Sequence, residues 1–172
     1  MMNTVNPRIS AKTQIETPLG PLLLVATDAG LAGAWFDAQK HHPGLLDVPV
    51  QPGQPHLAQA AREFAAYWRD GSTVFTVALD AAGTPFQQAV WQALLDIPSG
   101  GLSTYGEIAQ RIGRAAAVRA VGAAVGRNPI GIVVPCHRVI GRDGSLTGYA
   151  GGLHRKQALL ALEGATTGLL AA

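Results

Sequence analysis

The stretch NPIGIVVPCHRVIG, residues 128–141, holds the only cysteine of the chain, Cys136, between a proline and a histidine. The run IGIVV predicts a strand, and Pro135 ends it because proline lacks a backbone N–H and forces the residue before it into an extended conformation. Cys136 is therefore expected at a bend, where backbone groups are exposed. A thiol becomes a nucleophile as the thiolate, which the adjacent His137 can favour.

A second interpretation of Cys136 is inert packing, because a lone cysteine in apolar surroundings is usually buried and unreactive. Adjacent residues of an extended chain point to opposite sides, so a contact between the thiol and His137 requires a turn or a bridging water. A third group should orient the imidazole, and Glu163 is the only acidic residue after Asp143. The stretch predicts a cysteine-based site, for which hydrolysis of an acyl substrate is one candidate reaction.

The composition predicts a folded chain. Of 172 residues, 48% are hydrophobic and 14% charged, which suits one domain or two small ones. One cysteine cannot form an internal disulfide, and residues 1–15 lack the apolar core of a signal peptide. The longest apolar runs, PLLLVA and GIVVP, are far shorter than the ~20 residues that cross a bilayer. We expect a cytoplasmic protein, monomeric in solution, without a membrane segment.

Charge is divided unevenly along the chain. Residues 1–100 carry 5 basic and 8 acidic side chains, whereas residues 101–172 carry 8 basic and 3 acidic ones. A basic region that also contains the thiol suggests a polyanionic partner such as nucleic acid. Ordinary surface charge is the alternative explanation.

The first third of the chain predicts a β-meander. Residues 13–36 alternate strand-like runs with the turn sequences TPLG and TDAG. The Pro/Gly-rich residues 41–56 predict an exposed loop, and residues 73–80, TVFTVALD, predict a further strand.

A helix is predicted over residues 56–70. Gly71 lies just past its end, and helical spacing places four residues on its inner face: Leu57, Ala61, Phe64 and Trp68.

Two helices of the second half carry capping boxes. Thr84 precedes Pro85 and Gln87, and Thr104 stands three residues before Glu107, so helices should begin after each threonine. The second helix should end at a glycine turn that leads into a helix over residues 115–126. Two short helices joined through a glycine are the outline of a helix-turn-helix.

The helix over residues 115–126 has one long polar side chain, Arg119. Reading bases in the major groove requires several such side chains, so we do not expect this helix to read bases. A bare, alanine-rich helix can approach a backbone closely, as entry into the narrow minor groove requires. The alternative is that the alanines pack the helix into the core.

The segment after the thiol predicts a hairpin and a helix. Residues 137–149 place Asp143 and Gly144 at a turn, which could form a wing. Residues 153–164 predict a helix whose inner face carries Leu159, Leu160 and Leu162. The tail, residues 165–172, gives no structural signal.

These motifs resemble a known family. TYGEIAQRIG, VRAVGAA, NPIGIVVPCHRVIG and LTGYAGGLHRKQALLALEG are similar to the O6-alkylguanine-DNA alkyltransferases nearly continuously over residues 84–164. The N-terminal part resembles the family's N-terminal domain. The resemblance implies an α+β protein, with a ribonuclease-H-like α/β domain at 1–82 and a mostly helical winged helix-turn-helix domain at 83–172.

The resemblance also implies residue roles. Cys136 would accept the alkyl group, while His137, through a water, and Glu163 would deprotonate it. Tyr105 would donate a hydrogen bond or proton to the flipped base, and Arg119 would fill the gap left in the stack. Asn128 would be a hinge beside the active-site strand. The guanine pocket would be lined by Tyr149 and by the backbone of Cys136, Val139 and Ala150. The other expected DNA contacts are Thr104, Ala117, Ala120, Gly122 and Arg138.

The chain departs from the family in two ways. Some members have serine at position 150, but the role implied there belongs to a backbone N–H, so Ala150 should serve. Some members bind zinc through N-terminal cysteines and histidines. This chain has no second cysteine, and its N-terminal histidines lack a ligand spacing, so we expect no metal and no cofactor.

The activity implied is single-turnover DNA repair. An alkyl group on O6 of guanine, and in an extended hypothesis on O4 of thymine, would pass irreversibly to Cys136 after the base is flipped out of the duplex. Double-stranded DNA would be bound through the minor groove without sequence preference. Two alternatives are a lesion-recognition protein without transfer and a cysteine hydrolase.

Overall fold

The computed structural model describes residues 5–165; residues 1–4 and most of the featureless tail, 166–172, lie outside the described residues, as do the outer ends of both predicted domains. The chain divides into two compact units. One comprises residues 1–82 with 129–131, and the other comprises 83–128 with 132–172. The predicted α+β class is confirmed.

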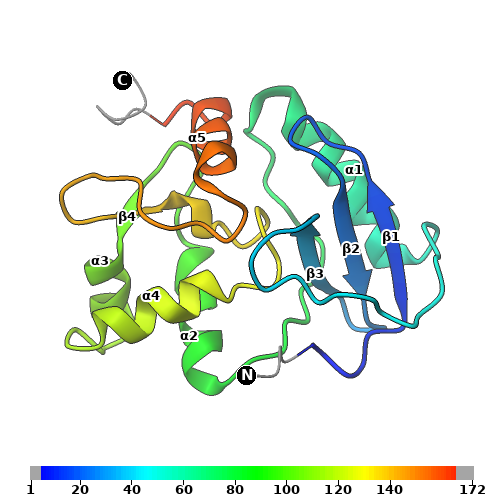
Figure 1. The fold of residues 1–172 in the computed structure, drawn as a ribbon, viewed down its shortest axis with the longest axis horizontal. Coiled ribbons are helices and arrows are strands. Elements are labelled where there is room, and N and C mark those ends of the chain that lie inside the picture. The colour runs from blue at the N-terminus through cyan, green and yellow to red at the C-terminus, as the bar shows by residue number, and fades with distance from the viewer. Residues whose placement is uncertain (1–4, 166–172) are drawn as a thin grey trace. The chain divides into compact units, whose positions relative to one another are not determined.

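The first unit is built on a three-stranded antiparallel sheet (Figure 1). Its strands are β1 (Ala11–Ile15), β2 (Leu22–Ala26) and β3 (Leu31–Phe36), in the order β1-β2-β3. Every strand pairs with its sequence neighbour, which is the topology that short turns allow. The predicted β-meander is confirmed.

Helix α1 (Pro55–Asp70) packs against this sheet. The Gln54 side chain caps its first turn, and Gly71, with φ of 75°, ends it in the left-handed conformation that glycine adopts freely. The buried residues are Leu57, Ala60, Phe64 and Tyr67. Of the predicted inner face, Leu57 and Phe64 are buried, whereas Ala61 and Trp68 are only partly buried. Spacing alone did not choose between the adjacent aromatics, whereas packing did, because the Tyr67 ring lies 5.6 Å from that of Phe75.

The strand predicted over residues 73–80 is wrong. Within this segment only Leu79 forms a β-bridge, to Leu31. The Glu63 carboxylate on α1 accepts hydrogen bonds from the backbone N–H groups of Thr76, at 3.0 Å, and Val77, at 3.2 Å. At Thr76 and Val77, hydrogen bonds to the Glu63 side chain thus take the place of the backbone hydrogen bonds to a neighbouring strand.

The second unit contains four α-helices, a short 3₁₀ helix and two very short strands among its described residues. In chain order they are α2 (Pro85–Leu94), β4 (Ser103–Thr104), α3 (Tyr105–Arg111), α4 (Val118–Gly126), the 3₁₀ helix η1 (Cys136–Arg138), β5 (Val139–Ile140) and α5 (Leu153–Leu162). Both predicted capping boxes are formed, by Thr84 with Gln87 and by Thr104 with Glu107. Helices α2, α3 and α4 pack against one another.

The strand predicted at IGIVV is also wrong. Ile130 forms one bridge to Ala34, and the chain then turns at Ile132, which has φ of 71°. That value is left-handed backbone, which interrupts an extended strand and is rare for a β-branched residue. The bend expected before Cys136 is present.

The hairpin predicted over residues 137–149 is replaced by a lone turn. Gly144 has φ of 84°, and Gly141 N–H donates to the Ser145 carbonyl at 2.9 Å, so the turn lies where expected. However, β5 pairs in parallel with β4. The carbonyls of Val139 and Thr147 on the two arms instead accept hydrogen bonds from the Lys156 ammonium.

Helix α5 buries Leu159 and Leu160, as predicted, whereas Leu162 is only partly buried. It also buries Lys156 completely. No helix in residues 5–165 is both long and apolar enough to span a bilayer.

Candidate active site

Cys136 opens the 3₁₀ helix directly after a tight turn centred on Pro135. Pro135 has φ of −84° and ψ of 63°, and Cys136 N–H donates to the Val134 carbonyl at 2.8 Å, which is the geometry of an inverse γ-turn. The Asn128 side chain donates to the same carbonyl at 2.7 Å. Because Cys136 and His137 lie on helical backbone, the alternation expected of an extended chain does not separate them.

The structure brings His137 and Glu163 together. His137 Nε2 lies 2.7 Å from Glu163 Oε1, and both side chains are fully buried. Glu163 stands at the C-terminal cap of α5, so this helix carries the carboxylate to the 3₁₀ helix. The contact links two residues that are 26 positions apart in the sequence.

Arg138 is placed differently from the prediction. It was expected to contact DNA, but its side chain is only 10% exposed and forms a two-pronged ion pair with Glu163. Arg138 Nε donates to Oε2 and Nη2 to Oε1, each at 2.9 Å, while Nη1 donates to the Ile97 carbonyl at 2.6 Å. The assignment of Arg138 as a DNA-binding residue is therefore wrong, since its side chain is buried and each of its three nitrogens donates to a group inside the protein.

Glu163 is held as a carboxylate. Burial raises the pKa of Glu163, but hydrogen bonds from His137 and Arg138, together with the Arg138 charge, outweigh burial and lower it to about 2. Burial lowers the pKa of His137, an effect that its contact with Glu163 opposes. We therefore describe His137 as a neutral imidazole beside an ionised carboxylate.

This protonation fixes the tautomer of His137. An ionised carboxylate only accepts hydrogen bonds, so the ring nitrogen facing Glu163, Nε2, must carry the proton. Nδ1 then has a free lone pair, and it is a buried atom that has no hydrogen-bond partner in the described part of the chain, residues 5–165. The site therefore contains a buried, oriented base on the residue next to the thiol.

The thiol itself is buried, with Cys136 8% exposed. Burial raises the pKa of Cys136, and the Asn128 side chain, the charge of Lys156 and nearby backbone N–H groups act against that rise. Asn128 thus stabilises the turn by its bond to the Val134 carbonyl and also favours the thiolate of Cys136. The pKa of Tyr149 is raised well above its usual range by burial and, next, by the charge of Cys136.

Lys156 belongs to this environment and sequence reasoning did not identify it. It is fully buried, and its Nζ donates to the carbonyls of Val139 and Thr147. A signal was available, because Lys156 precedes the buried Leu159 and Leu160 by three and four residues, which puts all three on one helix face.

Tyr105 begins α3 and lies beside the turn and α4. Its hydroxyl accepts a hydrogen bond from Thr147 Oγ1 at 3.3 Å, and a Cβ on Gly122 would come within 3.8 Å of its ring. The Thr104 hydroxyl is used in capping, since it accepts from Glu107 N–H at 3.2 Å. Ala150 is partly buried.

Helix α4 presents small residues to solvent. Arg119, Ala120 and Ala123 are exposed and Ala117 is partly exposed, whereas Val121, Ala124 and Val125 are buried. Core packing thus accounts for Ala124 but not for Ala120 or Ala123. The exposed face combines one long cation with methyl groups.

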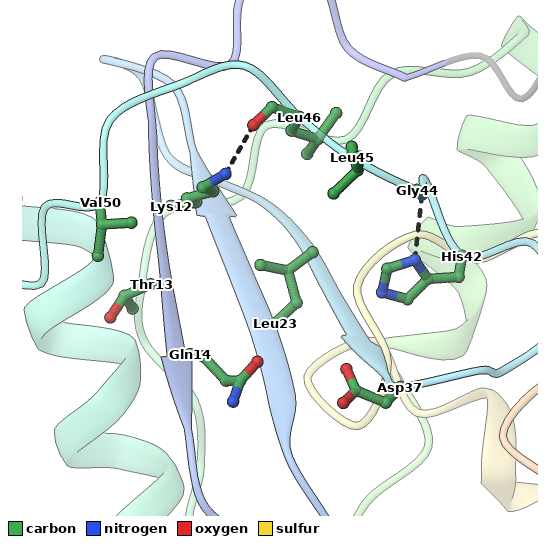
Figure 2. A pocket seen from close by; sticks show the side chains of 10 residues that line it. All are labelled: Lys12, Thr13, Gln14, Leu23, Asp37, His42, Gly44, Leu45, Leu46 and Val50. Carbon is green, nitrogen blue, oxygen red and sulfur yellow. Dashed lines mark hydrogen bonds between the residues drawn. The ribbon is translucent and has the colours of Figure 1, made fainter.

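A separate cavity of about 290 Å³ lies in the first unit, lined by residues of β1, β2 and the loop after β3 (Figure 2). It contains none of the predicted site residues. Lys12 Nζ donates to the Leu46 carbonyl at 2.6 Å, and His42 Nδ1 accepts from Gly44 N–H at 3.0 Å (Figure 2). Two polar side chains of the cavity are therefore already hydrogen-bonded to the backbone of the loop.

Comparison with known proteins relates this chain to DNA repair proteins. Residues 85–165 match the family described as 6-O-methylguanine DNA methyltransferase, DNA binding domain. The methylated-DNA–protein-cysteine methyltransferase of Mycobacterium tuberculosis is 48% identical over 149 residues, covering 87% of this chain and 89% of that protein. The protein of the same name from Shigella flexneri is 43% identical and covers 88% of this chain and 94% of its own length.

Solved structures agree. The crystal structure of Mycobacterium tuberculosis OGT in complex with DNA has a TM-score of 0.84 and 47% identity, covering 89% of this chain and 92% of that one. The O6-methylguanine methyltransferase structure from the same organism has a TM-score of 0.81 and 45% identity, covering 95% and 98%. The resemblance found in the sequence is confirmed, and the chain belongs to the methylated-DNA–protein-cysteine methyltransferase family.

Proposed function

We propose that this protein repairs DNA by transferring an alkyl group from O6 of guanine to Sγ of its own Cys136. The observation that carries the proposal is the buried arrangement around the only cysteine of the chain. There, Glu163 orients a neutral His137 whose Nδ1 has no hydrogen-bond partner among the described residues. Such a base can take the thiol proton directly or through a water, and this step converts a weak nucleophile into a strong one.

The chemistry balances without a cofactor. The sulfur attacks the alkyl carbon, a C–S bond forms, and the C–O6 bond breaks with its electron pair on the guanine. The proton that left the thiol passes to the guanine, which stays in the DNA strand as ordinary, unmodified guanine. The thioether is not readily reversed, so each protein molecule acts once.

Pocket residues would stabilise the leaving base. We assign Tyr105 as hydrogen-bond donor to the flipped base and Tyr149, with the backbone of Val139 and Ala150, as the pocket lining. A donor aimed at the atom that gains charge lowers the barrier because the charge is met by a fixed dipole. O4-alkylthymine offers similar chemistry, and its repair is part of the proposal.

DNA would be bound by the exposed face of α4. The methyl groups of Ala120 and of Ala117, the N-cap residue of α4, together with Gly122, allow close approach to a minor groove, and Thr104, the N-cap residue of α3, would contact the DNA backbone. Arg119 would fill the stack where the target base has left. Because Arg119 is the one long polar side chain of this helix, the face cannot read several bases, and binding should be independent of DNA sequence. The related protein crystallised with DNA supports DNA as the partner.

We further assign the two domains and their context. Residues 1–82 would form a ribonuclease-H-like domain, which the meander and α1 support, and residues 83–172 a winged helix-turn-helix domain, which α3, α4 and the turn near Gly144 support. The protein would act in the cytoplasm as a monomer.

The decisive experiment is intact-mass measurement after mixing the protein with a duplex that contains one O6-methylguanine. The wild type should gain one methyl group, and Cys136→Ala should gain none. Lesion binding without mass gain would instead indicate recognition without transfer. Repeated turnover of an acyl substrate by Cys136 would indicate a hydrolase.

A further inference from the structure

Lys156 is a buried cation that has no acidic partner within residues 5–165. Its side chain is fully buried, and both of its hydrogen-bond acceptors, at 2.5 and 2.8 Å, are backbone carbonyls. No ion pair among residues 5–165 involves it. Burying an ammonium group without an anion is costly, so its presence calls for an explanation.

Counting the charges of the buried site leaves one positive charge without a negative counterpart. Arg138 and Glu163 neutralise each other, and His137 is neutral. Tyr149 has a raised pKa and is also neutral, and Arg155, whose charge acts on Tyr149, is only partly buried and so remains open to solvent. Lys156 therefore contributes one net positive charge, and the thiolate of Cys136 is the group that can balance it.

We propose that Lys156 is a positioning residue that favours the thiolate of Cys136 by supplying the balancing charge of the buried site. This inference rests on the proposed function only for the assignment of Cys136 as the nucleophile. Its second role is to hold Val139 and Thr147 together across the turn, and Thr147 in turn bonds the hydroxyl of Tyr105.

The electrostatics of the two groups are reciprocal. Burial lowers the pKa of Lys156 to about 8, against which the charge of Cys136 raises it. The charge of Lys156 in turn opposes the rise that burial imposes on the pKa of Cys136. Two groups that interact in this way titrate as a pair, so each is a probe of the other.

Alkylation of Cys136 should change the pKa of Lys156. A thioether carries no charge, so alkylation removes the anion that balances Lys156 while the ammonium stays buried. Lys156 should then lose its proton at a lower pH than in the unmodified protein.

The first test measures the pH dependence of the thiol. Because the chain has one cysteine, its reaction with iodoacetamide can be followed by intact mass across the pH range. Lys156→Gln retains hydrogen-bond donors but no charge, and its reactivity midpoint should rise by at least about one pH unit, a tenfold change in the acid constant. Lys156→Arg should restore most of the difference.

The matched control is Lys12→Gln, which removes another lysine whose Nζ donates to a backbone carbonyl, in the first unit. It should leave the midpoint unchanged. A folded Lys156→Gln protein with the wild-type midpoint would overturn the proposal. A shifted midpoint together with a wild type that never accepts a methyl group would overturn the proposed function and retain this inference.

The second test needs no variant that could fail to fold. The wild type is blocked at Cys136 with methyl methanethiosulfonate, which leaves an uncharged sulfur, and the ¹⁵N signal of the Lys156 side chain is titrated before and after. Deprotonation should occur at a lower pH in the blocked protein. Equal midpoints in the two forms would contradict the balancing role.

Discussion

At the scale of single residues, the two arginines Arg138 and Arg119 illustrate how environment decides a role. Both were expected to contact DNA. Arg119 is exposed on α4, as that role requires, whereas Arg138 is buried against Glu163. Arg138→Ala should destabilise the fold by about 3–5 kcal/mol because it leaves a buried carboxylate with one fewer partner. Arg119→Ala should change stability by less than about 0.5 kcal/mol. Urea unfolding of both variants checks this, and equal losses would contradict the burial-based assignment.

The pKa of Glu163 predicts an acid-dependent contribution to stability. Its ordinary value of 4.5 falls to about 2 in the folded protein, so the folded state binds fewer protons than the unfolded state between those values. The stabilisation is complete above the ordinary value and is lost as pH falls toward about 2. In urea unfolding, wild type should exceed Glu163→Gln at neutral pH, and the difference should shrink below about pH 4, since a protonated Glu163 resembles glutamine. A difference that stays constant down to about pH 3 would be evidence against this account.

At the scale of elements, local signals predicted the two capped helix starts, whereas the strands expected at 73–80 and 130–134 and the hairpin at 137–149 were wrong. Thr84 and Thr104 carry the hydrogen-bonding groups of their own caps, so neighbouring residues decide the outcome. The predictions for residues 73–80 and for the hairpin were wrong because side chains distant in the sequence bond the backbone groups that strand pairing would use. Glu63 takes the N–H groups near Thr76, and Lys156 takes the carbonyls of the expected hairpin.

The candidate site follows the same division. Cys136, His137 and Glu163 could be found from a motif and from the scarcity of acidic residues. The Arg138–Glu163 pair could not, because it joins residues 25 positions apart through a helix whose rotation only packing decides. The charge of an arginine gives no indication of whether it lies inside or outside.

Helix α4 yields a prediction of its own. Arg119→Ala should slow methyl transfer from duplex DNA by roughly tenfold or more, since the gap left by an extruded base costs a few kcal/mol to keep open. The same variant should react with the free base O6-methylguanine at nearly the wild-type rate. Arg114→Ala, which removes another exposed arginine just before α4, is the matched control. Equal loss of rate on both substrates would exclude the proposed role of Arg119.

At the scale of the whole molecule, the uneven charge predicts how DNA binding depends on salt. Residues 101–172 carry 8 basic and 3 acidic side chains, and buried Arg138 and Lys156 contribute nothing to phosphate contacts. The remaining basic groups release counterions when they meet phosphates, so the affinity for undamaged duplex should fall steeply between about 50 and 200 mM salt.

Fluorescence anisotropy with a labelled duplex measures this slope, and variants locate its source. Arg119→Ala should flatten the plot of log affinity against log salt by roughly one unit if its guanidinium meets a phosphate in the undamaged complex. Arg62→Ala, on exposed surface of α1 in the acidic half, should leave the slope unchanged. A slope near zero in the wild type would mean that the basic half of the chain is ordinary surface charge. The alanine-rich face of α4 would then have to bind DNA through close contact alone.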